Sequence, residues 1–204
     1  MTDTTAETPT VARDGANDLR PSRIDSRRAY LAFAFAFVFG HGAFAVSAGA
    51  DPLMDLPTWV PFVLLATGIV PGVGSSLMAG RRAQRDADPA DVLSEKLVGN
   101  AWATGFIAVT LAIIGLTSTV DLPPEVENVL FPIGAVFIVG MINIAEGAAR
   151  RNVLHYTLGS SLALISTAAL FLTEPGPYWV LALAGGSAYL IAAYFEGRRL
   201  AALG

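Results

Sequence analysis

The sequence contains no cysteine, and this absence excludes a disulfide, a thiolate nucleophile and a cysteine-ligated metal site. Charge is also scarce, because only 15% of the 204 residues are Asp, Glu, Lys or Arg, against roughly 25% in soluble domains. The charged residues crowd into the N-terminal segment and a few short joints, so long stretches carry no ionisable group. This composition excludes a disordered chain, a nucleic-acid-binding domain and an ordinary soluble enzyme.

Hydrophobic residues make up 53% of the chain, and its mean hydropathy is +0.55. They gather in segments close to the roughly 20 residues that a helix needs to cross about 30 Å of hydrocarbon. Lipid offers the backbone no hydrogen-bond partner, so such segments must pair their N–H and C=O groups internally as helices. The sequence therefore predicts an all-α, polytopic membrane protein with six transmembrane helices arranged as three hairpins. The predicted spans are residues 29–48, 58–80, 97–117, 125–148, 153–173 and 177–197.

The N-terminal segment differs from the rest in composition. Residues 1–28 hold almost nothing large and apolar, which predicts a disordered cytoplasmic tail ahead of a six-helix transmembrane domain over residues 29–204. An alternative stays open, because residues 26–31 resemble a twin-arginine export signal and residues 48–50 resemble a cleavage site. The length of the first apolar stretch and the five that follow favour a retained membrane span.

The segments outside the spans differ in charge between the two sides of the membrane. With six spans, all 13 Lys and Arg residues fall on one side of the membrane, and the positive-inside rule makes that side cytoplasmic. We therefore predict a multi-pass protein of the inner membrane with both termini in the cytoplasm. The opposite side receives acidic residues and proline-bearing turns, and its acids are Asp51, Asp55, Asp121, Glu125, Glu127 and Glu174.

The hairpins look related to one another. The even-numbered spans end in MAGRR (residues 78–82), AEGAARR (145–151) and FEGRR (195–199), and each begins just after an acid-and-proline turn. This spacing is compatible with three copies of a helical hairpin, although any hairpin array with this orientation would place proline outside and arginine inside. The layout resembles the HdeD-type acid-resistance membrane proteins, best over residues 158–199. The resemblance implies a non-enzymatic inner-membrane protein linked to stress resistance, and it supplies no catalytic residues.

His41 lies about eleven residues into the first span, between Gly40 and Gly42. Ionisable groups at that depth are costly and usually face a bundle interior, a cavity or a proton path. Two interpretations follow. His41 is either a neutral histidine hydrogen-bonded to a carbonyl of another helix, or part of a polar site in the membrane.

Three further polar residues complete the candidate intramembrane polar site, namely Asn143, Glu146 and Glu196. Glu146 lies four residues before Arg150, and Glu196 lies three before Arg199. These spacings favour ion pairs along one helix face, while an acidic pair could instead form a cation-attracting mouth. His155 and Tyr156 fall at the inner boundary, and we assign them no function.

The second span carries small residues at four-residue intervals, Gly68, Gly72 and Ser76, and Pro71 lies among them. Small residues with this spacing form a flat face for close helix packing. Pro71 removes one helical hydrogen bond and predicts a kink near the middle of the membrane. Broken helices also line transporter sites, so the segment has both a packing and a transport interpretation.

The function predicted from these features is that of a non-enzymatic, HdeD-like integral membrane protein without a catalytic residue, cofactor or metal. A P-loop and the motifs of intramembrane serine proteases and lipid-headgroup transferases are missing from the sequence. The alternatives are a small-solute or proton-coupled transporter that uses His41 and the Pro71 region, and a membrane subunit of a larger complex. The expected partners are the lipid bilayer and a second copy or another membrane protein, but not nucleic acid.

Overall fold

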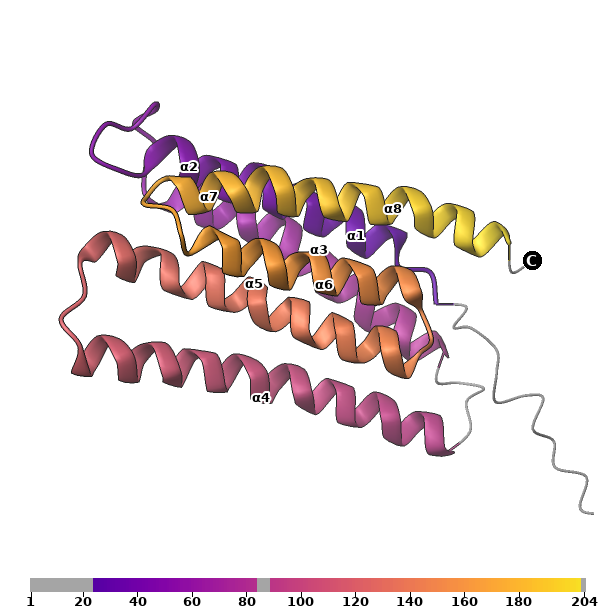
Figure 1. The fold of residues 1–204 in the computed structure, drawn as a ribbon. Helices are drawn as coiled ribbons and strands as arrows, with labels where there is room; N and C mark the ends of the chain where they lie inside the picture. The colour runs from indigo at the N-terminus through magenta and orange to yellow at the C-terminus, as the bar shows by residue number, and fades with distance from the viewer. Residues whose placement is uncertain (1–23, 84–88, 203–204) are drawn as a thin grey trace, which may run out of the picture.

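The computed structural model describes residues 24–83 and 89–202, and this part of the chain is helical and contains no strand. Six helical rods lie side by side and reverse direction at each turn (Figure 1). The predicted all-α, six-helix architecture is therefore confirmed. Five rods are long and apolar enough to cross a membrane, as in a multi-pass membrane protein. The rods are α1–η1–α2 (Arg27–Phe35, Ala36–His41 and Gly42–Ser47), α3 (Trp59–Ala83), α4 (Pro89–Thr119), α5 (Pro124–Ala149), α6 (Val153–Ala169) and α7–η3–α8 (Gly176–Val180, Leu181–Gly185 and Gly186–Ala201).

Most helix boundaries fall close to the predicted ones, but α6 is shorter. It ends at Ala169, before the predicted limit at residue 173, and its 17 residues span about 26 Å. The α-helical hydrogen bonds end there and are replaced by tighter turns, in which the backbone N–H groups of Leu170, Phe171 and Leu172 donate to carbonyls three residues earlier, at 3.1–3.2 Å. Most of the predicted tail, residues 1–23, lies outside the described residues, and helix α1 already begins at Arg27.

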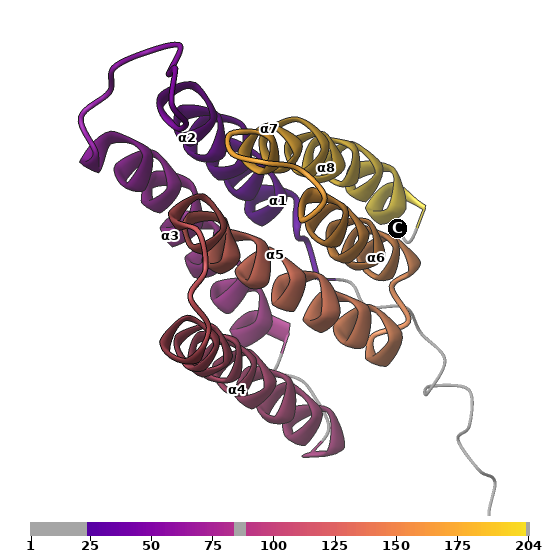
Figure 2. The ribbon, with the colours of Figure 1, turned by 60° about the vertical axis from the view of Figure 1, so that its left-hand side comes forward.

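The four central rods are α1, α5, α6 and α8, while α3 packs on α1 and α4 packs on α5 at the outside (Figure 2). One end of the bundle contains the start of α1, the ends of α3 and α8 and the α5–α6 turn (Figure 1). We call it the basic end, because it holds Arg27, Arg28, Arg81, Arg82, Arg150, Arg151, Arg198 and Arg199.

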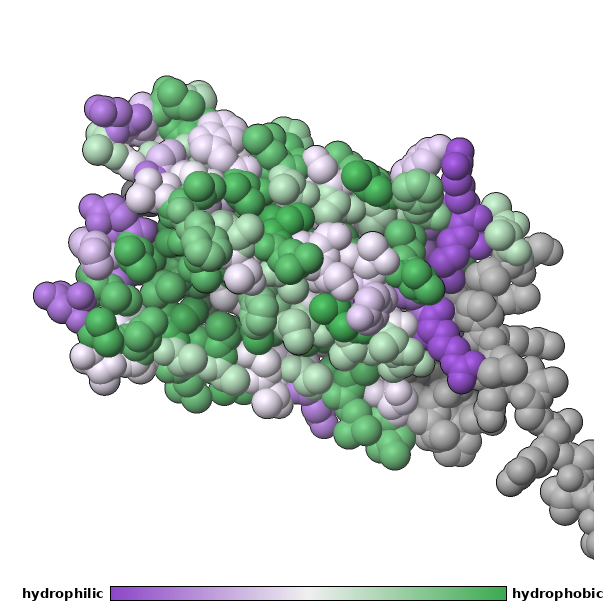
Figure 3. Space-filling view, in the orientation of Figure 1, coloured by the Kyte–Doolittle hydropathy of each residue, from purple (hydrophilic) through white to green (hydrophobic). Residues whose placement is uncertain are grey.

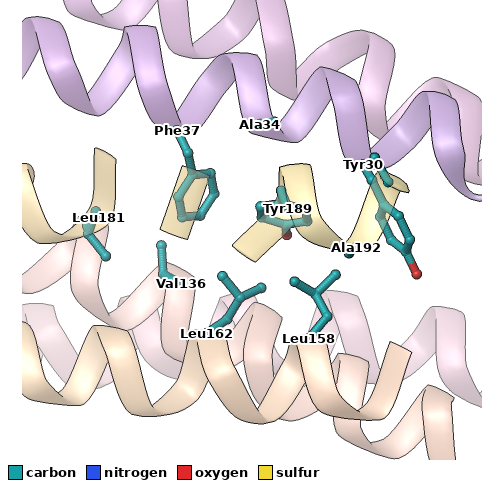
Figure 4. Packing of buried hydrophobic residues seen from close by; sticks show 10 residues of the cluster. Tyr30, Ala34, Phe37, Val136, Leu158, Leu162, Leu181, Tyr189 and Ala192 are labelled. Atoms are coloured by element: carbon teal, nitrogen blue, oxygen red, sulfur yellow. The ribbon is translucent and has the colours of Figure 1, made fainter. Parts of the chain in front are cut away.

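Large apolar side chains from the four central rods meet around Tyr189 (Figure 4). The Tyr189 ring lies 5.1 Å from the ring of Phe37 and 5.4 Å from that of Phe33, measured between centroids. Leu158 and Leu162 of α6 close the cluster from the opposite side. These ring contacts join the first rod to the last.

The first and last rods both contain a π-helical stretch, η1 and η3, and these stretches pack against each other. Gly185 and Gly186 leave the room there that the side chains of Phe37 and Val38 occupy. The π-helical turns were not predicted from the sequence. Such turns are rare and occur frequently at functional sites, and His41 is the last residue of η1.

Consecutive rods contact each other within each predicted hairpin, and α5 and α6 approach still more closely between the second hairpin and the third. Glycines allow this approach. A Cβ atom on Gly159 would lie 2.6 Å from the carbonyl oxygen of Gly140 and 2.6 Å from the backbone nitrogen of Ile144. Backbone atoms cannot move away as the end of a flexible side chain can. The close contact between α5 and α6 therefore requires glycine at this position.

The small-residue face of α3 packs on α1 over part of its length. A Cβ atom on Gly68 would meet the backbone of Ala32 at 2.5 Å, and one on Gly72 would meet the Phe33 ring at 2.8 Å. Ser76 is exposed, so the packed part of this face does not extend to it. The helix runs unbroken through Pro71, whose ring is also exposed, so Pro71 does not end the helix, and the kink stays a prediction.

We expect Gly159→Ala to separate α5 from α6 and to lower the free energy of unfolding by about 1–3 kcal/mol, the usual cost of overpacking. Gly115→Ala on α4 is the matched control, because no atom lies within 4 Å of its added Cβ. Thermal unfolding of the detergent-solubilised variants measures both changes. Equal unfolding temperatures for the two variants would contradict the close α5–α6 contact.

Candidate functional site

The Glu146 carboxylate lies near the basic end, in the last turn of α5, where it meets three nitrogen groups. Nε1 of Trp102 on α4 donates a hydrogen bond to Oε1 over 2.7 Å. Nη1 of Arg150 donates to Oε2 over 3.1 Å, and Nε2 of His155 lies 3.2 Å from the same oxygen. Glu146 is buried, so these groups take the place of water around its charge.

His155 connects this carboxylate to the first rod. Its Nδ1 lies 2.7 Å from the hydroxyl oxygen of Tyr30, and the two rings stack with centroids 6.0 Å apart. A neutral imidazole can donate from Nε2 to Glu146 while Nδ1 accepts from Tyr30, and a protonated one can donate from both nitrogens. We call Tyr30, Trp102, Glu146, Arg150 and His155 the basic-end cluster, which joins α1, α4, α5 and α6.

Asn143 lies one turn deeper than Glu146 on the same helix and is also buried. The Tyr189 ring of α8 lies 6.3 Å from the Tyr30 ring of the cluster, measured between centroids. The basic-end cluster therefore has an aromatic neighbour, Tyr189, on its inner side.

Glu196 forms a second buried ion pair at the basic end. Its side chain is 0% exposed, and its oxygens accept bonds from Arg199 Nε at 2.7 Å, from Arg199 Nη2 at 2.9 Å and from the backbone N–H of Ser26 at 3.2 Å. Arg199 also donates to the Ile24 carbonyl over 2.9 Å. The end of α8 is thereby fastened to the segment that leads into α1.

Asp25 belongs to this leading segment. Its carboxylate accepts a hydrogen bond of 2.7 Å from the Arg27 guanidinium. That side-chain bond lowers the pKa of Asp25 below its usual value, against a smaller opposing effect of burial. Both side chains are about half exposed, so the pair contributes little to stability.

His41 lies apart from these groups, at the end of η1. It is only 5% exposed, and its Nδ1 has no hydrogen-bond partner in the described part of the chain. Its ring meets Phe37 edge-on at 5.1 Å, and Phe37 in turn lies against Tyr189. The apolar Phe37 ring therefore stands between His41 and the polar groups nearer the basic end.

The structure separates the four residues of the predicted polar site. Asn143 and Glu146 lie one turn apart, Glu196 forms its own pair with Arg199, and no hydrogen bond or ion pair within the described ranges joins His41 to them. Both ion pairs expected from the helical spacing are present. The contact of His155 with Glu146 was not predicted from the sequence. One local signal was available, because Asn152 caps α6 and its side chain accepts a hydrogen bond from the His155 N–H at 3.1 Å. This cap places His155 in the first turn of α6.

Other kinds of site have little support in the described residues. No group of three His, Asp or Glu residues there is arranged to hold a metal ion. A hollow of about 540 Å³ lies at the end opposite the basic end, near Glu125 and Glu174, and another of about 240 Å³ lies between α6 and α8. His41 lines neither of them.

No family model matches this chain, and neither the curated proteins nor the solved structures contain a match.

We expect Trp102→Phe to weaken the packing of α4 on α5. No described side chain of α4 is buried, and the Trp102 indole N–H links this helix to α5 by its hydrogen bond to Glu146. A hydrogen bond to a charged group contributes about 2 kcal/mol, and Phe keeps the stacking on Phe106. Hydrogen–deuterium exchange should rise along α4 and stay unchanged in α8. Ile107→Ala, at an exposed α4 position, is the control, and equal exchange in both variants would contradict this link.

Proposed function

We propose that this chain is a non-enzymatic integral protein of the inner membrane, similar in layout to the HdeD-type proteins. The observation that supports it best is the basic-end cluster, in which Glu146 receives donors from α4, α5 and α6 while His155 reaches Tyr30 on α1. Each ionisable group of the cluster is engaged by another. Such an arrangement suits a packing role, since a catalytic acid or base needs an open side toward its substrate.

A stress-related role is what the resemblance to the HdeD-type proteins adds to this proposal. The cluster gives that role a physical basis, because it joins four helices through groups that bind protons. A change in the charge of Glu146 or His155 would alter contacts of α1, α4, α5 and α6 together.

The same proposal includes the orientation, with both termini in the cytoplasm. It is supported by the gathering of arginines at the basic end, while the opposite end carries Glu125, Glu127 and Glu174. Figure 3 shows hydrophilic residues at both ends of the bundle. Arginine near the ends of the spans is retained on the cytoplasmic side during insertion.

Single-cysteine variants test this orientation directly, because the native chain contains no cysteine. We expect Asp121→Cys to react with a membrane-impermeant maleimide added to intact spheroplasts. Ala201→Cys, at the exposed end of α8, should react only after the membrane is permeabilised. Labelling of both positions from the same side would contradict six spans.

One observation favours a second candidate function, a proton-coupled or small-solute transporter. The buried His41 carries an Nδ1 without a hydrogen-bond partner in the described chain, within a π-helical turn that packs on the other π-helical stretch. Unpartnered ionisable groups inside a membrane protein often belong to ion pathways. In that role the Phe37 ring would have to move, since it lies between His41 and Tyr189.

Proteoliposomes loaded with a pH-sensitive dye distinguish the two candidates. Under the packing role, the wild-type chain conducts protons no faster than protein-free vesicles under an imposed pH gradient. Proton flux that His41→Ala abolishes, with insertion and folding unchanged, would overturn the packing role and support transport. Phe37→Ala is the companion variant, because it removes the ring that separates His41 from Tyr189.

A further inference from the structure

A shallow groove of about 240 Å³ lies between α6 and α8, open to the side of the bundle. Leu154, Leu158 and Ile165 line it from α6, Ala184 lines it from η3, and Ala188 and Ile191 line it from α8. The two hydroxyl groups that α6 contributes are engaged within that helix, since Thr157 donates to the Val153 carbonyl at 2.8 Å and Ser161 to the Thr157 carbonyl at 2.9 Å. The groove therefore offers an apolar surface in the part of the bundle that hydrocarbon surrounds.

Two arginines lie where this groove approaches the basic end. Arg198 follows Ile191 by seven residues, hence on the same face of α8, and its guanidinium lies 4.8 Å from the centre of the Tyr194 ring. Arg151 precedes Leu154 by three residues, in the turn that leads into α6. Both are exposed, and neither forms an ion pair with a described carboxylate, in contrast to Arg150 and Arg199. Hydrophilic residues gather over the end of α8 and the α5–α6 turn, beside a mostly apolar face (Figure 3).

Arg151 also occupies an unusual backbone position. Its φ is 51°, in the left-handed region that glycine normally fills at the end of a helix. The Arg151 N–H donates to the Ala148 carbonyl at 3.2 Å, and the Asn152 N–H to the Gly147 carbonyl at 2.8 Å, which closes α5 in a Schellman motif. A charged side chain is thus kept at a position where glycine would fit with less strain.

We propose that this surface binds one anionic phospholipid, with an acyl chain in the α6–α8 groove and the phosphate of the head group between Arg151 and Arg198. The apolar lining matches a hydrocarbon chain, and the two arginines without carboxylate partners match the negative head group. The ligand differs from the lipid that surrounds any membrane protein, because it is selected by charge at one position.

Native mass spectrometry of the detergent-solubilised full chain tests the site, with phosphatidylglycerol and phosphatidylcholine of equal acyl length as probes. Wild type should retain phosphatidylglycerol preferentially. Arg151→Gly with Arg198→Gln should weaken that binding about 30-fold, the equivalent of roughly 1 kcal/mol for each arginine near a membrane surface. The Arg151→Gly change suits the left-handed backbone, so a loss of binding will not reflect a damaged turn, and thermal unfolding checks this.

The matched control is Arg81→Gln with Arg82→Gln, which removes the same charge from the same end of the bundle but at α3. It should leave phosphatidylglycerol binding within twofold of wild type. Ser187→Phe, at an exposed position in the groove, should weaken phosphatidylglycerol binding by occupying the place of the acyl chain. Equal retention of the two lipids, an equal loss in the control pair, or full displacement by inorganic phosphate would overturn the proposal.

Discussion

Hydrocarbon offers no hydrogen-bond partner, and this constraint governs where most polar groups of the described chain lie, His41 excepted. The backbone meets it by forming helices over almost the whole described length. Side-chain hydroxyls satisfy their hydrogen-bonding capacity by donating to carbonyls one turn earlier in the same helix. Thr67 donates to the Val63 carbonyl in this way, and Ser118 to that of Ile114. The carboxylates Glu146 and Glu196 meet the constraint at the basic end, where arginine and histidine donors are within reach.

The same constraint explains why helix packing relies on glycine. Apolar side chains gain little by leaving lipid for one another, so the rods are held by close fit and by polar contacts. Close fit is strongest between α5 and α6, where Gly140 and Gly159 bring the two backbones together. Polar contact matters most for α4, which has no buried side chain among those described and is tied to α5 by Trp102. The rods are therefore fastened by different means in different parts of the bundle.

Features that depend on local composition and spacing could be predicted from the sequence. Apolar segments of sufficient length predict the rods, and a separation of three or four residues predicts the pairs of Glu146 with Arg150 and of Glu196 with Arg199. The contact of Glu146 with Trp102 joins residues 44 positions apart, and that of Tyr30 with His155 joins residues 125 apart. Such contacts depend on which rods become neighbours, and helical periodicity carries no information about that. The early end of α6 and the π-helical turns have the same origin, since neighbouring rods alter the local backbone.

The aromatic rings of the core connect His41 to the basic-end cluster without providing a polar path between them. From His41 the rings run through Phe37 and Tyr189 to Tyr30 and His155, with centroid separations of 5.1, 5.1, 6.3 and 6.0 Å. A proton can be held at either end, but the Phe37 ring has no atom that can accept one. The rings are nevertheless in contact, so a shift of Tyr30 at the basic end can reach η1 by packing alone. This arrangement suits mechanical coupling between the basic-end cluster and the middle of the bundle better than it suits proton conduction. It therefore favours a packing role over a transport role.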